Sequence, residues 1–308
     1  MRTVPSDRRT GFGLYYFAAA AKDEACRNSR SFPAMTTHQL HTQHQRNFDA
    51  NRFVYPVLSR RSGGLSIGVN LNPDKVCNFD CIYCQVDRTT TSETRFVEMD
   101  ALLAELDAML KLVLFGEIWT TEKFSQTPSA LQRLNDIAFS GDGEPTTYRN
   151  FDEIIQRCAE LKACHESSHE RAGDVKIDVK MVLITNASMF HREHVQRGLA
   201  ILDANHGEIW AKLEAGTPEY FKLVDRTSIP FQRILDNITA AAKVRPLVIQ
   251  SLFMRVAGEA PSHEELSAFC DRLNEITAVG GQLRLVPVFT VARRPGATDV
   301  TPLGDAEV

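Results

Sequence analysis

Three cysteines that lie within eight residues are the side chains with the clearest potential for chemistry. The segment reads Cys77-Asn78-Phe79-Asp80-Cys81-Ile82-Tyr83-Cys84. Thiolates at this spacing can each ligate one iron of a 4Fe-4S cluster, which leaves the fourth iron without a protein ligand. An open iron is a reaction site, because a molecule that carries an amino group and a carboxylate can chelate it.

Two other kinds of metal site compete with this interpretation. A structural zinc site needs a closed tetrahedron, with a fourth ligand from a distant cysteine or histidine. A ferredoxin-like electron carrier needs a fourth cysteine near the first three, whereas the next cysteine after Cys84 is Cys158. The spacing favours the open cluster, and a non-catalytic metal-binding or electron-transfer protein is the alternative class.

Glycines and polar residues gather where predicted strands end. The first such segment is Ser140-Gly141-Asp142-Gly143-Glu144-Pro145-Thr146, directly after an apolar run at 136–139. Glycines let a backbone approach a ligand closely, because they carry no Cβ. Asn186 follows the next predicted strand, and Glu214 follows the one after it. In a barrel of parallel strands the carboxyl ends carry the chemistry, so we expect these residues to share one site.

Strand-like and helix-like segments alternate from Leu65 onward, and this alternation predicts the fold. The first strand starts at Leu65 and runs directly into the cysteine segment. Further strands are predicted at 136–139, 180–185, 208–213, 247–253 and 283–288. Helices are predicted around 99–112, 151–161, 231–238 and 262–273, the last with an inner face of Leu266, Phe269, Cys270 and Leu273. Six strands alternating with helices imply an α/β fold, a parallel sheet curled into a partial (βα)6 TIM-like barrel.

Composition excludes some classes of function and indicates a compartment. With a formal net charge of -4 over 308 residues, the chain lacks the polybasic character of a general nucleic-acid binder. The odd number of seven cysteines does not indicate a disulfide framework, so we expect a reducing, cytoplasmic location. We expect no membrane partner, because no run reaches the roughly 18 apolar residues of a membrane-spanning helix.

One domain is expected, with short segments on either side of it. Residues 65–295 hold the predicted strands and helices, residues 35–64 form a lead-in segment, and residues 296–308 form a frayed tail. Residues 1–34 are expected to be a poorly ordered extension, and Met35 offers an alternative translation start. The apolar run from Phe12 to Ala21 imitates a secretory signal, but it is short and contains Gly13.

The cysteine segment, with Tyr83 before the third cysteine, resembles the signature loop of the radical S-adenosylmethionine (SAM) superfamily. The resemblance implies a 4Fe-4S cluster on Cys77, Cys81 and Cys84. It also implies that this cluster reductively cleaves SAM to a 5'-deoxyadenosyl radical, which abstracts hydrogen from a substrate. In that family the aromatic residue lies against the adenine, a role that falls here to Tyr83.

The same resemblance implies further contacts with SAM. The segment Gly141-Asp142-Gly143-Glu144 is similar to the family's glycine-glycine-glutamate element, which binds the amino group, with Asp142 in the place of a glycine. By similarity, Asn186 is the candidate for the methionine carboxylate and Glu214 the candidate for the ribose. No catalytic residue beyond these is assigned.

Three longer segments of the sequence indicate a particular group within this superfamily. Ser59–Leu71, Asp136–Thr146 and Phe289–Pro295 resemble a bacterial group of iron-sulfur oxidoreductases related to the wyosine-tRNA synthases. The resemblance covers roughly 59–295 and implies a reductant partner such as flavodoxin or ferredoxin. We expect hydrogen abstraction from an unidentified substrate, with wyosine-type modification of a tRNA base as the alternative.

Overall fold

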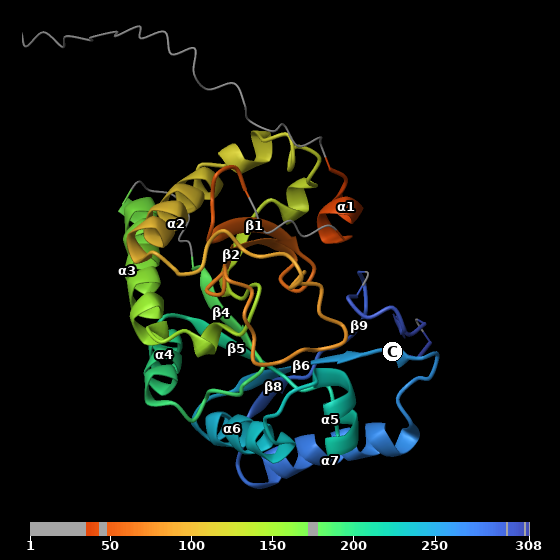
Figure 1. Cartoon of the computed structure of the whole chain (residues 1–308). Coiled ribbons are helices and arrows are strands. Elements are labelled where there is room, and N and C mark those ends of the chain that lie inside the picture. The colour runs from red at the N-terminus through yellow and green to blue at the C-terminus, as the bar shows by residue number, and fades with distance from the viewer. Residues whose placement is uncertain (1–34, 43–47, 172–177, 294, 305, 308) are drawn as a thin grey trace, which may run out of the picture. The chain divides into compact units, whose positions relative to one another are not determined.

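A mostly parallel sheet organises the chain, as Figure 1 shows. The computed structural model describes residues 35–42, 48–171, 178–293, 295–304 and 306–307. The predicted extension at residues 1–34 therefore lies outside the described residues. Within them, none of the helices is long and apolar enough to cross a membrane.

Parallel strands form the sheet in the order in which they occur along the chain. They are β2 (Gly64–Val69), β3 (Leu134–Phe139), β4 (Lys180–Thr185), β5 (Gly207–Lys212) and β6 (Leu247–Phe253). The predicted sixth strand is two strands, β8 (Leu283–Leu285) and β9 (Val288–Thr290), and both pair with β6 in parallel. The interruption falls at Val286 and Pro287, because a proline has no N–H to donate to the ladder. The α/β partial-barrel prediction is confirmed.

An additional strand precedes the predicted ones. The lead-in segment contains α1 (Thr37–Thr42) and β1 (Val54–Ser59), and β1 pairs with β2 in antiparallel register. Tyr55 of β1 packs directly on Gly68 of β2, where an added Cβ would lie 2.4 Å from the tyrosine ring carbon Cζ. Gly68 thus lets the Tyr55 ring lie flat over the inner face of the sheet.

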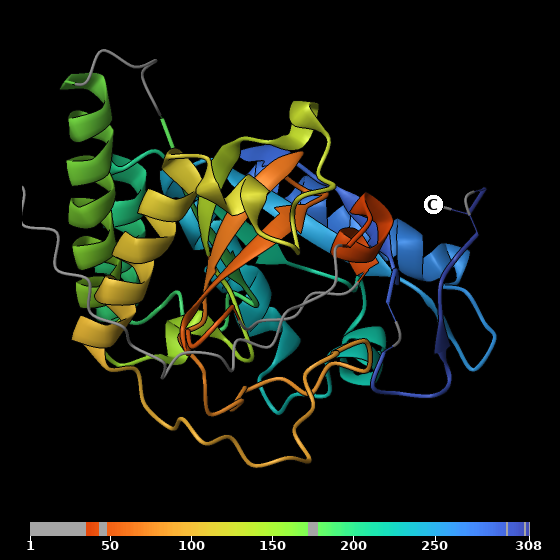
Figure 2. The same ribbon diagram turned by 90° about the horizontal axis from the view of Figure 1, so that it is seen from above.

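Helices alternate with the parallel strands and pack on the sheet. Their bounds are α2 (Met99–Leu114), α3 (Phe151–Arg171), α4 (Glu193–Ala204), α5 (Pro218–Asp225), α6 (Phe231–Val244) and α7 (His263–Ala278). Figure 1 and Figure 2 show α2, α3 and α4 along one flank of the sheet and α6 with α7 along another. Short elements complete the chain, namely η1 (Glu117–Thr120), η2 (Ser129–Leu131), η3 (Pro145–Thr147), β7 (Arg255–Val256) and β10 (Val300–Thr301).

Two helix predictions need correction. Helix α3 extends well past the predicted segment 151–161 and ends at Arg171. On α7, Cys270 is exposed, and the buried face consists of Glu265, Phe269 and Ile276. The helix is rotated relative to the prediction because Phe269 packs edge-on against Phe253 of β6, with ring centroids 5.2 Å apart.

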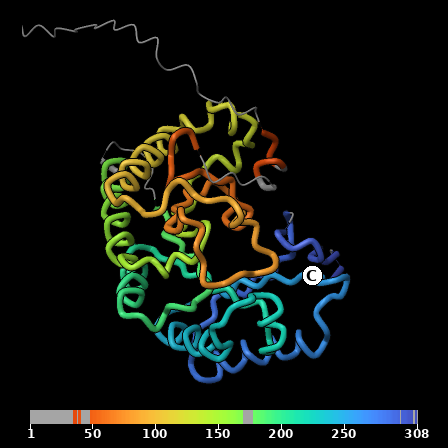
Figure 3. The backbone as a smooth tube through the Cα atoms, viewed as in Figure 1, coloured from red at the N-terminus to blue at the C-terminus, as the bar shows by residue number. Residues whose placement is uncertain are grey.

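The connection from β2 to α2 carries the cysteine segment. Residues 70–98 contain no helix or strand, and Figure 3 traces them, in orange to amber, as a wide loop. Their path is fixed by backbone hydrogen bonds to α5 and to residues 296–297.

Candidate functional site

One cavity of about 420 Å³ brings most of the predicted site residues together. Cys77, Cys81, Cys84 and Tyr83 line it, and so do Gly141, Asp142, Gly143, Glu144 and Asn186. The carboxyl ends of β2, β3 and β4 therefore meet the cysteine loop at one place. Glu214 does not line the cavity but lies behind Tyr83, as described below.

Backbone hydrogen bonds hold the cysteine loop on two sides. On one side, the N–H groups of Asp80 and Ile82 donate to carbonyls at the end of α5, at 3.1 Å and 2.9 Å. On the other, the N–H of Gly296 donates to the carbonyl of Cys84 at 2.9 Å, and Ala297 donates to Ile82 at 3.3 Å. The expectation of a frayed tail was wrong at this point, because the chain just after Pro295 supports the loop and Val300–Thr301 pairs with β7.

The three thiols are half-buried and differ in their surroundings. Burial raises the pKa of Cys77, and it raises the pKa of Cys81 well above the usual value. The Cys81 thiol donates to Oδ1 of Asp225 at 3.3 Å. Nη2 of Arg88 lies 3.6 Å from Sγ of Cys84, while Nη1 is buried without a hydrogen-bond partner among the described residues.

This donor set fits an iron-sulfur cluster. Cysteine thiolates are soft ligands that suit Fe–S clusters, and a guanidinium beside them offsets negative charge. No group of three or more His, Cys, Asp or Glu side chains in the described part of the chain surrounds a single ion position. Thiolates that ligate a cubane bind different irons, so they do not need to converge on one point.

Tyr83 is held by a lysine and a glutamate at the end of β5. Its hydroxyl donates to Oε1 of Glu214 at 2.8 Å and accepts from Nζ of Lys212 at 2.6 Å. Nζ of Lys212 also lies 4.5 Å from the centre of the Tyr83 ring and 3.5 Å from Glu214 Oε1. Burial raises the pKa of Glu214, an effect that the neighbouring Lys212 charge opposes. Tyr83 thus has one fixed position against the cavity.

Glu144 connects the ends of β3 and β4. Its Oε1 accepts from Oγ1 of Thr185 at 2.5 Å and from the N–H of Thr146 at 3.1 Å, and its Oε2 accepts from the N–H of Asn186 at 2.7 Å. The side chain is 3% exposed, and burial raises its pKa although these hydrogen bonds act in the opposite direction. The carboxylate therefore sets the relative position of the two strand ends that border the cavity.

Asparagines connect the loops around the cavity. Nδ2 of Asn186 donates to Oδ1 of Asn78 at 2.9 Å, and Nδ2 of Asn78 donates to Oγ of Ser188 at 2.7 Å. Asn70, at the end of β2, donates to Oδ2 of Asp142 at 2.7 Å and accepts from its N–H at 3.1 Å. Asp142, which stands in the place of a glycine, is thus used to fix its own loop on β2.

Glycines let this loop lie directly on the cysteine segment. A Cβ added at Gly141 would be 2.1 Å from Oδ1 of Asn70, and one at Gly143 would be 2.1 Å from the carbonyl oxygen of Val76. Contacts that short are forbidden, so any side chain here would separate the two loops.

We expect Gly143→Ala to lower the free energy of unfolding by about 1–3 kcal/mol, the usual cost of overpacking. We also expect weaker binding of SAM, because the loop must move away from Cys77. Gly304→Ala is the control, since its Cβ would meet only the end of the Glu307 side chain, at 3.3 Å. Thermal melting and equilibrium binding of SAM measure both effects, and equal values for the two variants would contradict the prediction.

Several residues of the site were missed by sequence reasoning. Asp225 and Arg88 contact the cysteines, and Lys212 contacts Tyr83, yet the sequence analysis assigned none of the three to the site. Asp225 is the last residue of α5, far along the chain from Cys81, so no local pattern connects the two residues. Lys212 could have been predicted as a site residue from its position at the end of a strand, which is the feature that indicated Asn186.

Residues 71–259 match the Radical SAM superfamily. A UPF0026 protein of Helicobacter pylori is 26% identical over 226 residues, which cover 72% of this chain and 61% of that protein. A GTPase Obg of Brachyspira hyodysenteriae is 26% identical over 199 residues, which cover 63% of this chain and 24% of that protein. The chain thus spans less than two thirds of the length of these relatives.

Two solved structures are similar to this chain at low sequence identity. TYW1 with a lysine-pyruvate adduct bound has a TM-score of 0.44 at 14% identity, covering 77% of this chain and 68% of that chain. SuiB of Streptococcus suis has a TM-score of 0.47 at 14% identity, covering 80% and 45%.

The fold and the site define a class, that of α/β partial-barrel proteins whose cysteine loop and strand ends border one cavity. The match over residues 71–259 includes more than half of the 308 residues, and the chain belongs to the Radical SAM superfamily. The matched residues include the cysteine loop and the carboxyl ends of β3, β4 and β5.

Proposed function

We propose that Cys77, Cys81 and Cys84 hold the cluster and that the enzyme abstracts hydrogen from a substrate bound in the cavity. The observation that carries the proposal is that the three cysteines and the residues at the ends of β3 and β4 line this same cavity. A 4Fe-4S cluster held by these cysteines would supply the one electron needed to cleave SAM to methionine and a 5'-deoxyadenosyl radical, and this radical would take a hydrogen atom from the substrate.

Roles for the chain's own residues follow from their contacts. Tyr83 presents its ring to the adenine, and Glu214 acts by fixing Tyr83 and Lys212, since it is 2% exposed and already bonded to both. Lys212 lines the cavity and offers its ammonium, together with Asn186, to the methionine carboxylate. The peptide groups of residues 141–144 face the amino group. Together these residues orient SAM and exclude water from it.

The test is a reaction of the anaerobically reconstituted full chain with dithionite and SAM. We expect 5'-deoxyadenosine and methionine in equal amounts, together with the brown colour of the cluster. Zinc in the purified protein, without a chromophore and without cleavage, would support the non-catalytic alternative instead.

Partners are part of the proposal. A flavodoxin or a ferredoxin would supply the electron in place of dithionite, and a reduced flavodoxin should then support the same cleavage. Modification of a tRNA base is the alternative reaction. Stimulation of SAM cleavage by total tRNA, or loss of one modified nucleoside in cells without the protein, would favour it.

A further inference from the structure

The cavity extends along the inside of the barrel, away from the cysteines. Its lining includes Val57 and Ser59 of β1 and Arg60 and Arg61 of the turn between β1 and β2. This turn lies beside the amino-terminal ends of the parallel strands. Asp136 on β3 and Ser140, the residue after β3, are four residues apart, which is about 13 Å at roughly 3.3 Å per residue. The cavity is therefore deep enough for a small molecule below the cofactor.

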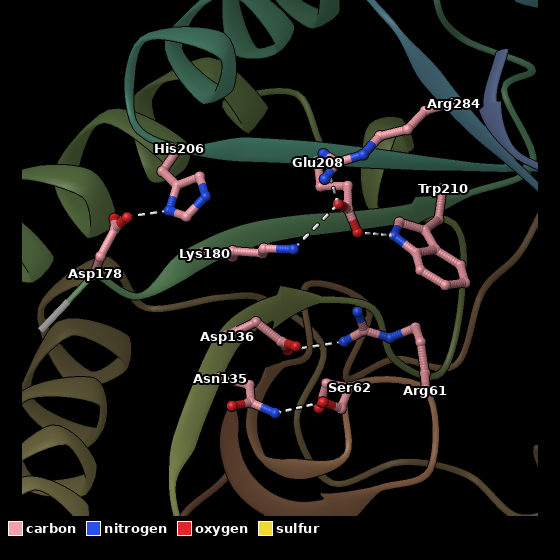
Figure 4. Close-up of polar contacts among 10 residues, drawn as sticks. All are labelled: Arg61, Ser62, Asn135, Asp136, Asp178, Lys180, His206, Glu208, Trp210 and Arg284. Carbon is pink, nitrogen blue, oxygen red and sulfur yellow. Dashed lines mark hydrogen bonds and ion pairs between the residues drawn. The ribbon is translucent and has the colours of Figure 1, made fainter.

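Arg61 is held in a fixed orientation at this deep end. Its Nη2 donates to Oδ1 of Asp136 at 2.8 Å, and its guanidinium carbon lies 5.0 Å from the centre of the Trp210 ring (Figure 4). The hydroxyl of Ser66 donates to the same oxygen of Asp136. The Arg61 side chain is 13% exposed, whereas Asp136 is 1% exposed, so the arginine faces the cavity and the carboxylate lies behind it.

The guanidinium has capacity left for a ligand. It carries five N–H groups, and the described residues accept a hydrogen bond only from Nη2. The turn that bears it is fixed as well, because Nδ2 of Asn135 donates to the carbonyl of Ser62 at 2.5 Å (Figure 4). A positioned guanidinium with free donors is suited to bidentate capture of a carboxylate or phosphate.

Glu208, the carboxylate that bonds to Trp210, is paired with cations other than Arg61. Glu208 accepts from Nε1 of Trp210 at 2.7 Å and pairs with Lys180 at 3.3 Å and with Arg284 at 3.2 Å (Figure 4). Arg60 also lines the cavity and has no ion pair with any described residue. The deep end therefore has more positive than negative charge.

Between the two ends the wall is mostly apolar. Ile184, Leu252 and Phe289 line it, and the side-chain amide oxygen of Gln250 is buried there without a hydrogen-bond partner among the described residues. An orphaned buried acceptor costs free energy unless a ligand satisfies it. A ligand with a hydroxyl or amino group in its middle part would do so.

We propose that the deep end of the cavity binds the anionic end, a carboxylate or a phosphate, of a small-molecule substrate, with Arg61 as the anchor. This inference rests on the proposed function, because it places the substrate of that reaction below SAM. Asp136 and Trp210 are positioning residues that orient the guanidinium. The rest of the substrate then extends toward the strand ends, where the hydrogen atom is removed.

Binding of simple anions to the reconstituted, SAM-loaded full chain tests the proposal. Inorganic phosphate and acetate are titrated separately at constant ionic strength, with calorimetry and the melting temperature as readouts. We expect one of the two to bind, which identifies the anionic group. Arg61→Met should weaken that binding about 10- to 100-fold, as expected for loss of charge-assisted hydrogen bonds. Arg61→Lys should give an intermediate loss, because it keeps the charge without the fork.

Arg284→Met is the matched control. It also removes a guanidinium that is paired with a carboxylate, but Arg284 does not line the cavity. Anion affinity in this variant should stay within about twofold of the unmodified chain.

The proposal is overturned if neither anion binds, if both methionine variants lose affinity equally, or if tRNA stimulates SAM cleavage equally with and without Arg61. If Arg61→Met does not fold, the Arg61→Lys titration decides. Formation of 5'-deoxyadenosine with dithionite alone is measured in parallel, so failure of the proposed function is distinguished from failure of the anion site.

Discussion

Cys81→Ala is expected to abolish SAM cleavage completely and to lower the iron content of the reconstituted protein. Cys81 is the central ligand of the proposed set, and its loss leaves only Cys77 and Cys84 to hold the cluster. Iron and sulfide content, the visible absorption of the cluster and the yield of 5'-deoxyadenosine are the measurements. Cys84→Ala should give the same result.

Cys270→Ser is the control for this prediction. Cys270 is a free, exposed thiol on α7, outside the cavity, so the substitution should leave iron content and cleavage unchanged. Full activity in Cys81→Ala would show that the cysteine loop is not the cluster site. Loss of activity with normal iron content would mean that Cys81 acts in some way other than as a ligand.

Lys212→Met is expected to have the second largest effect, on stability as well as on activity. The substitution leaves the Glu214 carboxylate, 3% exposed, without its cation. Breaking a buried ion pair typically costs about 3–5 kcal/mol of folding free energy. We expect about 3 kcal/mol here, because the Lys212 side chain is 24% exposed to solvent. Denaturant unfolding measures the loss. SAM affinity should fall as well, since Tyr83 loses one of the two groups that hold it.

A double-mutant cycle with Glu214→Gln separates the interaction energy of the Lys212–Glu214 pair from the contributions of the two individual side chains to stability. If the charges act as a pair, Lys212→Met with Glu214→Gln should be more stable than Lys212→Met alone, because no unpaired carboxylate remains. Tyr83→Phe is the companion variant and should affect SAM binding more than stability. Additive losses in the cycle would show that Lys212 and Glu214 act independently.

Local sequence was sufficient for the parallel strands β2 to β6 and for the cysteine loop. Strand β4 has the predicted bounds, Lys180–Thr185, because a short apolar run bounded by polar residues has few alternatives in a parallel sheet. Local sequence was insufficient to predict β1, since Val54–Ser59 becomes a strand only by pairing with β2. It also misjudged α7, where packing against Phe253 decided which face is buried.

Within the site, the sequence by itself determined which residue types stand at the strand ends and in the loop, because spacing along the chain is a local property. Only the tertiary structure decided which of them meet. Asp225 reaches Cys81, Lys212 reaches Tyr83, and Arg61 turns into the barrel toward Asp136. These contacts join residues that are 75 or more positions apart, and their geometry depends on how the sheet curls, which no local pattern specifies.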